Sequence, residues 1–228
     1  MERNDATWRN DVTRIMEHGI VAVIRGVPAE RVPDVARALR NGGVRTLEVT
    51  AGTPGAMALI ERLAAELGGD VLVGAGTVLD AETARAAILS GARFIFSPTV
   101  HAPTIAAAKR YGVVSIPGAM TPTEIVSAYE RGADLIKVFP ASVLGPRFFS
   151  DVRGPLPHIP LMPTGGVDAS NLAAYVQAGA AAFGVGGSLL PPKETWDEEG
   201  LSKLTLRARR LTEALIQARS SSAAPPKD

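Results

Sequence analysis

The sequence predicts a (β/α)8 barrel, an α/β fold in which eight parallel strands form the centre and helices surround them. Eight short apolar runs alternate with longer amphipathic segments along the chain. Such alternation is typical of parallel sheets with helical crossovers, and a length of 228 residues suits a single barrel domain. Several helical segments end on glycines that recur at similar intervals, namely Gly43, Gly69, Gly91, Gly112 and Gly132. An open, doubly wound sheet is the second possibility.

The predicted strands are rich in apolar residues with little polar alternation, as expected for strands covered on both faces. In chain order they are residues 20–26, 46–50, 71–77, 94–98, 113–118, 135–140, 160–166 and 181–188. The first run is followed by IRGVPAE, which has one glycine where a dinucleotide-binding turn needs three. The sequence therefore does not indicate a dinucleotide-binding domain.

The segments between these strands carry helix-terminal signals. Residues 28–43 end in a glycine pair, which is a typical helix C-cap. Asp80 is in place to cap one helix, and Thr121 with Glu124 matches a capping box at another. We also expect an additional N-terminal helix, one barrel domain over residues 1–220 and a flexible C-terminal tail over residues 221–228.

Composition excludes several classes of function. A net charge of +1 provides no basic surface for nucleic acid, and the absence of cysteine excludes disulfides and thiolate chemistry. The charged N-terminus lacks a signal-peptide run, and no stretch approaches the roughly 20 apolar residues of a membrane helix. We expect a cytoplasmic protein without nucleic-acid or membrane partners.

Three charged residues occupy positions where a buried strand normally has apolar ones. Lys137 lies inside LIKVFP, Glu48 inside TLEVT, and Arg25 ends the first strand. Inward-facing residues near the carboxyl ends of barrel strands face the active site, so these three groups should converge on one pocket. A structural Lys137–Glu48 ion pair is the alternative, but stability is a weak reason for keeping such a pair.

The surroundings of Lys137 indicate its chemistry. Burial among apolar residues disfavours the ammonium form, so the pKa should fall and free amine should be available near neutral pH. A free amine condenses with a ketone to give a Schiff base, in which Glu48 would move protons. Arg25 offers a planar guanidinium that suits a substrate carboxylate.

Two glycine-rich loops predict a phosphate site. Gly165 and Gly166 follow the seventh strand, and Gly187 and Ser188 follow the eighth. Glycines let backbone N–H groups approach an anion, a following helix would add its dipole, and barrels often bind phosphate with these loops. Ordinary tight turns are the alternative.

The remaining motifs add support without deciding the function. Thr77 and Pro98 end the third and fourth strands, and Phe139 follows the lysine as a wall of its pocket. The three histidines show no metal-ligand spacing, so we expect neither a metal nor another cofactor.

Together these motifs resemble the 2-keto-3-deoxy-6-phosphogluconate (KDPG) aldolase family, which includes relatives acting on 4-hydroxy-2-oxoglutarate and on 2-keto-3-deoxy-6-phosphogalactonate. The matching stretches, from about residue 20 to 190, are VAVIRG, GGVRTLEVT, GAGTVLD, FIFSPTV, IPGAMTPTE, LIKVFPA, GPRFF, PTGGV and GVGGS. The resemblance implies a metal-independent class I aldolase of carbohydrate metabolism in the Entner–Doudoroff pathway, assembled as a homotrimer and acting on a phosphorylated 2-keto acid.

The resemblance also implies roles for individual residues. Lys137 would form the Schiff base and Glu48 would be the general acid/base. The implied substrate-binding residues are Arg25 and Thr77 for the pyruvyl end, Pro98 and Phe139 for the pocket wall, Thr164 near the C4 hydroxyl, and Gly165, Gly166, Gly187 and Ser188 for the phosphate.

Position 52 departs from part of the family. Some members carry an arginine a few residues after the strand-two glutamate, whereas this chain has Gly52. Other members use an arginine of the first strand, as Arg25 allows. Thr164 resembles gluconate-type enzymes, because galactonate-type relatives tend to have an apolar residue there.

Several functions remain open from the sequence. The leading one is cleavage of 2-dehydro-3-deoxy-6-phosphogluconate to pyruvate and D-glyceraldehyde 3-phosphate. Cleavage of 4-hydroxy-2-oxoglutarate or of the galactonate epimer is the alternative within the family. A phosphate-binding isomerase or epimerase would use Glu48 and Lys137 without a covalent step, and a non-catalytic oligomeric scaffold or engineered derivative would use neither.

Overall fold

Parallel strands form the centre of the molecule, and helices surround them. The computed structural model describes residues 5–223. The strands are β1 Ile20–Ile24, β2 Thr46–Thr50, β3 Leu72–Gly76, β4 Phe94–Phe96, β5 Val114–Ile116, β6 Gly118–Ala119, β7 Ile136–Val138, β8 Leu161–Pro163 and β9 Phe183–Val185. The helices are α1 Asp5–His18, the short 3₁₀ turn η1 Ala29–Arg31, α2 Val32–Asn41, α3 Ala56–Leu67, α4 Ala81–Leu89, α5 Ala102–Arg110, α6 Pro122–Glu130, α7 Ala141–Arg153, α8 Leu172–Gln177 and α9 Glu198–Ala223.

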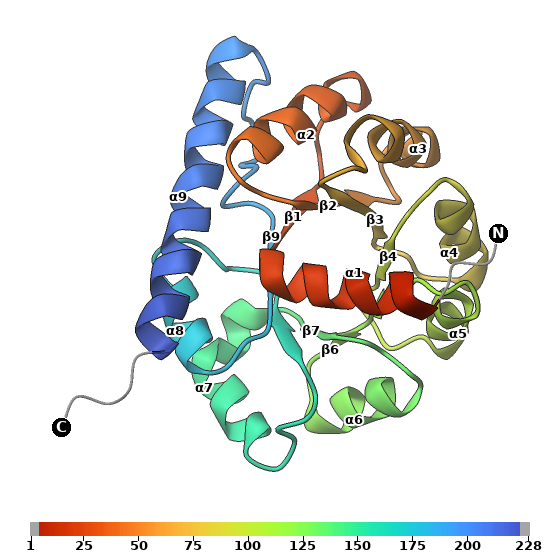
Figure 1. The fold of residues 1–228 in the computed structure, drawn as a ribbon, viewed down its shortest axis with the longest axis vertical. Coiled ribbons are helices and arrows are strands. Elements are labelled where there is room, and N and C mark those ends of the chain that lie inside the picture. Colours follow the sequence, from red (N-terminus) through yellow and green to blue (C-terminus); the bar gives the residue numbers. More distant parts are fainter. Residues whose placement is uncertain (1–4, 224–228) are drawn as a thin grey trace.

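The strands belong to two parallel sheets, ordered β5-β4-β3-β2-β1-β9 and β6-β7-β8. The predicted run 113–118 gives two strands because Pro117, which has no N–H, separates β5 from β6. Backbone bonds cross both gaps between the sheets: Asp134 N, just before β7, donates to Ser115 O of β5 at 2.9 Å, and Ala181 N, just before β9, donates to Leu161 O of β8 at 2.8 Å. The predicted parallel α/β architecture is confirmed, and Figure 1 shows the helices surrounding the strands.

Residues alternate along each strand between two buried clusters. The larger cluster joins outward-facing strand residues such as Leu47 and Val49 to the surrounding helices. The smaller one holds Ile15, Val21, Leu72, Phe94, Phe96, Val114, Ile116, Leu135, Met162 and Ala182. Because successive side chains of a strand point to opposite faces, this second cluster fills the space inside the strands.

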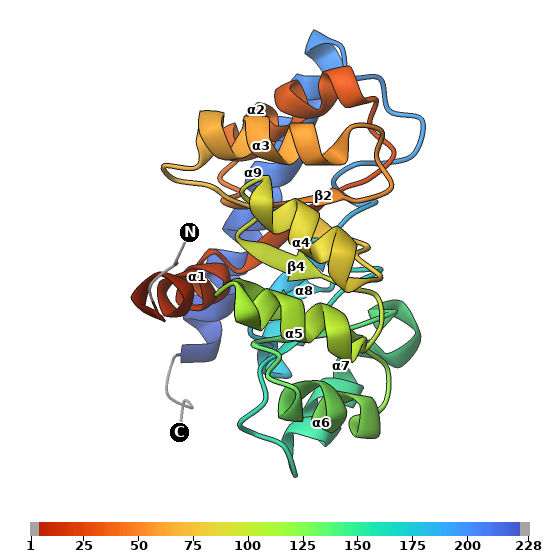
Figure 2. The same ribbon diagram turned by 90° about the vertical axis from the view of Figure 1, so that its right-hand side faces the viewer.

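The predicted N-terminal helix, α1, lies across the end where the strands begin. Figures 1 and 2 show it over the ring of strands, on the side opposite the arrowheads. Ile15 of α1 is fully buried in the inner cluster. The buried carboxylate of Asp11 accepts two hydrogen bonds from Arg93, at 2.6 and 2.5 Å. Helix α1 therefore closes this end of the strand ring.

Helix α9 packs against α2 and α8 and also binds the end of α1. Arg219 donates to Glu17 O at 2.8 Å and to Met16 O at 2.7 Å, which satisfies carbonyls at the helix end. The helix continues to Ala223, so residues 221–223 of the predicted tail are helical, and 224–228 lie outside the described residues.

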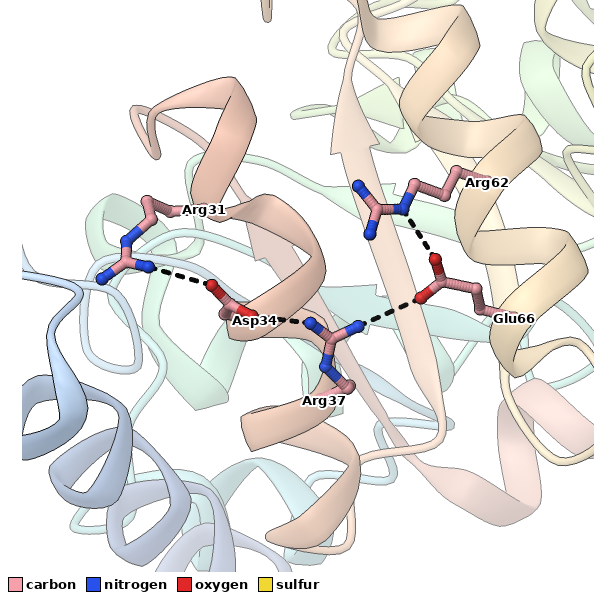
Figure 3. Close-up of polar contacts among 5 residues, drawn as sticks. All are labelled: Arg31, Asp34, Arg37, Arg62 and Glu66. Atoms are coloured by element: carbon pink, nitrogen blue, oxygen red, sulfur yellow. Dashed lines mark hydrogen bonds and ion pairs between the residues drawn. The ribbon is translucent and has the colours of Figure 1, made fainter.

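Charged residues on the outer surface of η1, α2 and α3 form the network shown in Figure 3. Arg37 bonds both Asp34, at 2.6 Å, and Glu66, at 3.1 Å. Arg31 and Arg62 extend it to either side. These groups are partly exposed, so the network contributes little to stability and lies away from the strand ends described next.

Among residues 5–223 no helix is long and apolar enough to span a membrane.

Candidate active site

The site lies inside the strand ring, above the inner apolar cluster. Strand alternation turns Glu48 and Lys137 inward, since both lie on the opposite face of their strands from residues that pack against the helices. On one side of each strand the partner in the ladder is a glycine: Glu48 pairs with Gly74, and Lys137 pairs with Gly118. The space beside Gly74 is occupied by the Phe94 ring and that beside Gly118 by Pro98, so these glycines pack against neighbouring strands and do not house the two polar side chains.

Lys137, on β7, is held between two aromatic rings. Its side chain is buried, and Nζ lies 4.9 Å from the ring centroids of both Phe96 and Phe139. Burial lowers the pKa of Lys137, Glu48 opposes that shift, and Arg25 reinforces it. The direction agrees with the sequence expectation, so free amine forms more readily than in an exposed lysine.

Glu48, on β2, is 1% exposed, and its Oε2 has no hydrogen-bond partner among the described residues. Burial raises the pKa of Glu48, while the charges of Lys137 and Arg25 oppose the rise. No ion pair joins Glu48 to Lys137, so the purely structural pair considered from the sequence is not formed. An unpartnered buried carboxyl is costly for folding and is common where protons are transferred.

Gly76 sets the position of the Glu48 carboxyl. A Cβ placed on Gly76 would overlap the Glu48 carboxylate. Glycine at this point of β3 is thus required by the close approach of Glu48, not by the strand itself.

Arg25 and Thr77 meet at the rim. Arg25 Nη2 donates to Thr77 Oγ1 at 2.9 Å. Thr77 has a φ of 55°, a left-handed conformation that is a genuine outlier for a β-branched residue. Both residues line a small cavity of about 260 Å³ together with Gly52 and Thr53. At position 52 there is consequently open space beside Arg25, where some relatives would place an arginine.

Both glycine loops line one cavity above the strands. This cavity of about 650 Å³ also contains Arg25, Lys137, Phe139 and Thr164 on its wall. Gly165 and Gly166 have φ of 88° and 82°, values that disfavour residues with a side chain. Among the described residues, the N–H groups of Gly166, Gly187 and Ser188 donate to no protein acceptor. They remain available for an anion.

Two details of the loops differ from expectation. The Ser188 hydroxyl donates to Val167 O at 2.7 Å, so it ties the two loops together. No helix follows Ser188 directly, because Leu189 N and Leu190 N both bond Gly186 O in a turn and α9 begins only at Glu198. The expected helix dipole is therefore missing at this loop, and an anion there would rely on N–H groups and nearby cations.

Thr164 and Pro98 occupy different walls. Thr164 is buried, lines the large cavity and has an Oγ1 without a partner among the described residues. Pro98 lines a neighbouring cavity of about 420 Å³, which it shares with Phe139. Phe139 thus separates the two cavities.

Sequence reasoning missed several residues of the site. Phe96 contacts the Lys137 amine, but in FIFSP it is indistinguishable from a core phenylalanine. Asp168, Lys193 and Trp196 line the large cavity from loops. Loop residues carry no periodicity, so only their sequence distance from the glycine loops could have suggested them.

Within the described residues, no group of three or more His, Asp or Glu side chains could hold a metal ion.

The chain is similar in sequence to a known protein family and to named proteins. Residues 12–206 match the family model described as "Aldolase: KDPG and KHG aldolase". A protein of Treponema pallidum named 2-dehydro-3-deoxy-phosphogluconate aldolase is 40% identical over 189 residues, covering 81% of this chain and 89% of that one. A protein of Rhizobium meliloti named "Probable 2-dehydro-3-deoxy-6-phosphogalactonate aldolase" is 36% identical over 178 residues, covering 78% and 84%.

A solved structure is also similar. The KDPG aldolase of Legionella pneumophila, with pyruvate captured as a covalent carbinolamine intermediate, superposes with a TM-score of 0.79 at 28% identity. The match covers 88% of this chain and 97% of that one.

Proposed function

Because the chain belongs to the KDPG and KHG aldolase family and is therefore an aldolase, a lyase, we propose that it cleaves 2-dehydro-3-deoxy-6-phosphogluconate through a Schiff base on Lys137. The products are pyruvate and D-glyceraldehyde 3-phosphate. The observation that carries the proposal is a buried lysine with a lowered pKa that lines a large cavity and has no ion-pair partner in Glu48.

The reaction begins at the substrate ketone. The Lys137 amine adds to C2 to give a carbinolamine, which loses water to form a protonated imine. A base removes the proton of the C4 hydroxyl, the C3–C4 bond breaks, and its electron pair moves to the imine nitrogen. Glyceraldehyde 3-phosphate leaves. The remaining enamine takes a proton at C3, and hydrolysis releases pyruvate and restores the amine.

Glu48 is proposed as the group that moves these protons. Its raised pKa brings the carboxyl closer to the working pH, where one group can both accept and donate. The carboxyl does not bond the lysine, so the reacting atoms or a water would lie between them. The neighbouring Phe96 and Phe139 rings keep the amine in place without hydrogen-bonding it.

The two ends of the substrate would bind on opposite sides of Lys137. Arg25, oriented by its bond to Thr77, would pair with the carboxylate and so supply what Gly52 does not. The N–H groups of Gly166, Gly187 and Ser188 would bind the phosphate, with Gly165 giving the loop its conformation. Pro98 and Phe139 would form the side wall.

Reductive trapping tests the covalent step. Borohydride added with pyruvate should reduce the imine and leave a stable three-carbon adduct on Lys137, detected by mass spectrometry of peptides. Borohydride without pyruvate is the control. A folded protein that gives no adduct, or an adduct on another of its lysines, would defeat the proposal.

We propose that the site prefers the substrate epimer with the gluconate configuration at C4. The buried Thr164 hydroxyl lacks a partner, and a C4 hydroxyl in the cavity would provide one. The 4-hydroxy-2-oxoglutarate activity, which the family description includes, is the second candidate and would show as cleavage without a phosphate preference.

Thr164→Val tests this assignment. Loss of one hydrogen bond should lower kcat/KM for the gluconate substrate about fivefold and bring it closer to that for the galactonate epimer. The substitution removes a buried unpaired hydroxyl, so the melting temperature should not fall. An unchanged ratio of kcat/KM for the two epimers would exclude Thr164 as the selecting residue.

Three further features belong to the proposal. We infer that β5 and β6 act as one strand, which makes an eight-stranded barrel of residues 1–220, supported by the backbone bonds across both gaps. As the family resemblance implies, we propose a cytoplasmic homotrimer. Family membership favours the aldolase over the isomerase and scaffold alternatives.

A further inference from the structure

Lys193, in the loop between β9 and α9, lines the same large cavity as Lys137 and both glycine loops. It follows Ser188 by five residues, and no described residue forms a hydrogen bond or ion pair with it. The acidic residues of the same cavity wall are already engaged. Glu194 pairs with Arg207 at 2.7 Å, and Asp168 accepts bonds from Ser170 and Asn171.

The backbone of Lys193 has an unusual conformation. Glu194 N bonds Pro191 O at 3.3 Å, which closes a turn with Pro192 and Lys193 at its centre. Lys193 has a φ of 76°, and the third position of such a proline turn is normally glycine or asparagine. Thr77 and Lys193 are the non-glycine residues with positive φ between residues 5 and 223, and both lie at the mouth of the site.

The loop holds this conformation through its flanks. Trp196 is buried, Leu190 is buried, and Arg207 bonds both Glu194 and Leu189 O. Left-handed conformations of non-glycine residues persist where the surroundings impose them, and they are found preferentially at functional sites. The turn itself would favour glycine or asparagine, so turn chemistry does not account for the lysine.

We propose that Lys193 is a substrate-binding residue that pairs with the phosphate of the substrate and favours phosphorylated over unphosphorylated 2-keto acids. The inference rests on the proposed function and adds to it a charged phosphate ligand. The free N–H groups of the glycine loops are neutral donors, and the helix dipole expected there is missing, so a nearby cation supplies the charge complement that a dianion needs.

The test compares two variants of this residue. Lys193→Asn removes the charge and fits the turn, whereas Lys193→Arg keeps the charge. Lys203→Gln, on the surface of α9, is the control lysine. Pyruvate release is measured with 2-keto-3-deoxy-6-phosphogluconate and with its unphosphorylated counterpart.

For Lys193→Asn we expect KM for the phosphorylated substrate to rise about three- to tenfold, with kcat changed little and the unphosphorylated substrate unaffected. Lys193→Arg and Lys203→Gln should behave like the wild type. In the wild type, KM for the phosphorylated substrate should rise with salt more steeply than in Lys193→Asn. Equal losses for both substrates, or no loss, would overturn the inference.

Two measurements separate this inference from the proposed function. Pyruvate has no phosphate, so borohydride trapping on Lys137 should be the same in Lys193→Asn and the wild type. Binding of inorganic phosphate, measured by calorimetry, should weaken in Lys193→Asn whether or not cleavage occurs. Failure of trapping in the wild type defeats the aldolase mechanism, whereas unchanged phosphate binding defeats the role of Lys193.

Discussion

Lys137→Arg and Lys137→Met are expected to lose cleavage almost completely, with kcat/KM falling at least about 10⁴-fold. Methionine has no amine, and arginine does not deprotonate at any working pH. Neither side chain can therefore form the imine that draws electrons from the C3–C4 bond. The measurement is pyruvate release under single-turnover and steady-state conditions.

The arginine variant distinguishes the mechanisms considered from the sequence. If the lysine acted only through its charge, as in an isomerase, Lys137→Arg would keep part of the activity. The exposed Lys203 again provides the matched control, since Lys203→Arg should leave kcat/KM unchanged. Substantial turnover by Lys137→Arg would contradict covalent catalysis.

The Lys137→Met substitution should also stabilise the folded protein. The pKa of Lys137 is lower in the folded protein than in the unfolded chain, so folding near neutral pH either desolvates the ammonium or releases its proton. Lys137→Met removes this cost and should raise the melting temperature measurably near neutral pH. The cost is complete below the folded pKa and vanishes as pH rises to the unfolded value of about 10.4, so the gain should shrink in alkaline buffer.

Glu48→Gln is expected to lower kcat by about 10²- to 10⁴-fold, the usual contribution of general acid–base catalysis. The amide keeps the shape of the carboxyl but cannot take up a proton. Trapping of pyruvate on Lys137 should become slower without being abolished, since the amine is still present. Full activity in Glu48→Gln would show that another group carries the protons.

Gly76→Ala provides a second view of the same carboxyl. The added methyl would overlap Glu48, so the carboxyl must move, and a displacement of about 1 Å can cost 10²-fold in rate. Gly69→Ala is the matched control, because Gly69 lies outside the site and a Cβ there meets no atom within 4 Å. Loss of activity in Gly76→Ala with intact folding would establish positioning by β3.

Much of this site follows from strand periodicity. A lysine in LIKVFP and a glutamate in TLEVT conflict with buried strands, and a conflict of that kind indicates function. The neighbouring strands and the inward direction of both side chains then follow from the predicted barrel. The burial and the direction of both pKa shifts agree with that reasoning.

Other parts depend on contacts that no single sequence specifies. Phe96 looks like any core residue until β4 is placed beside β7. The role of Gly76 is fixed by a side chain on the neighbouring strand. The Ser188 hydroxyl is taken up by Val167, and the expected helix after it is replaced by a turn, because both features depend on how two loops meet. The missing N–H of Pro117 explains why the strand divides there into β5 and β6. It does not predict which sheet each of the two strands joins.

Closure of one end by α1 has a consequence for turnover. Ile15 and the inner apolar cluster fill the ring at the α1 end, so substrate and products would pass through the cavity lined by Arg25, Phe139 and Lys193. In the proposed mechanism the aldehyde is freed while the three-carbon fragment is still attached to Lys137, so the aldehyde would leave first. Aldehyde that accumulates can re-enter the cavity and react with the enamine, which reverses the cleavage. Carbon–carbon bond formation is therefore an expected activity of a site that is closed at the α1 end.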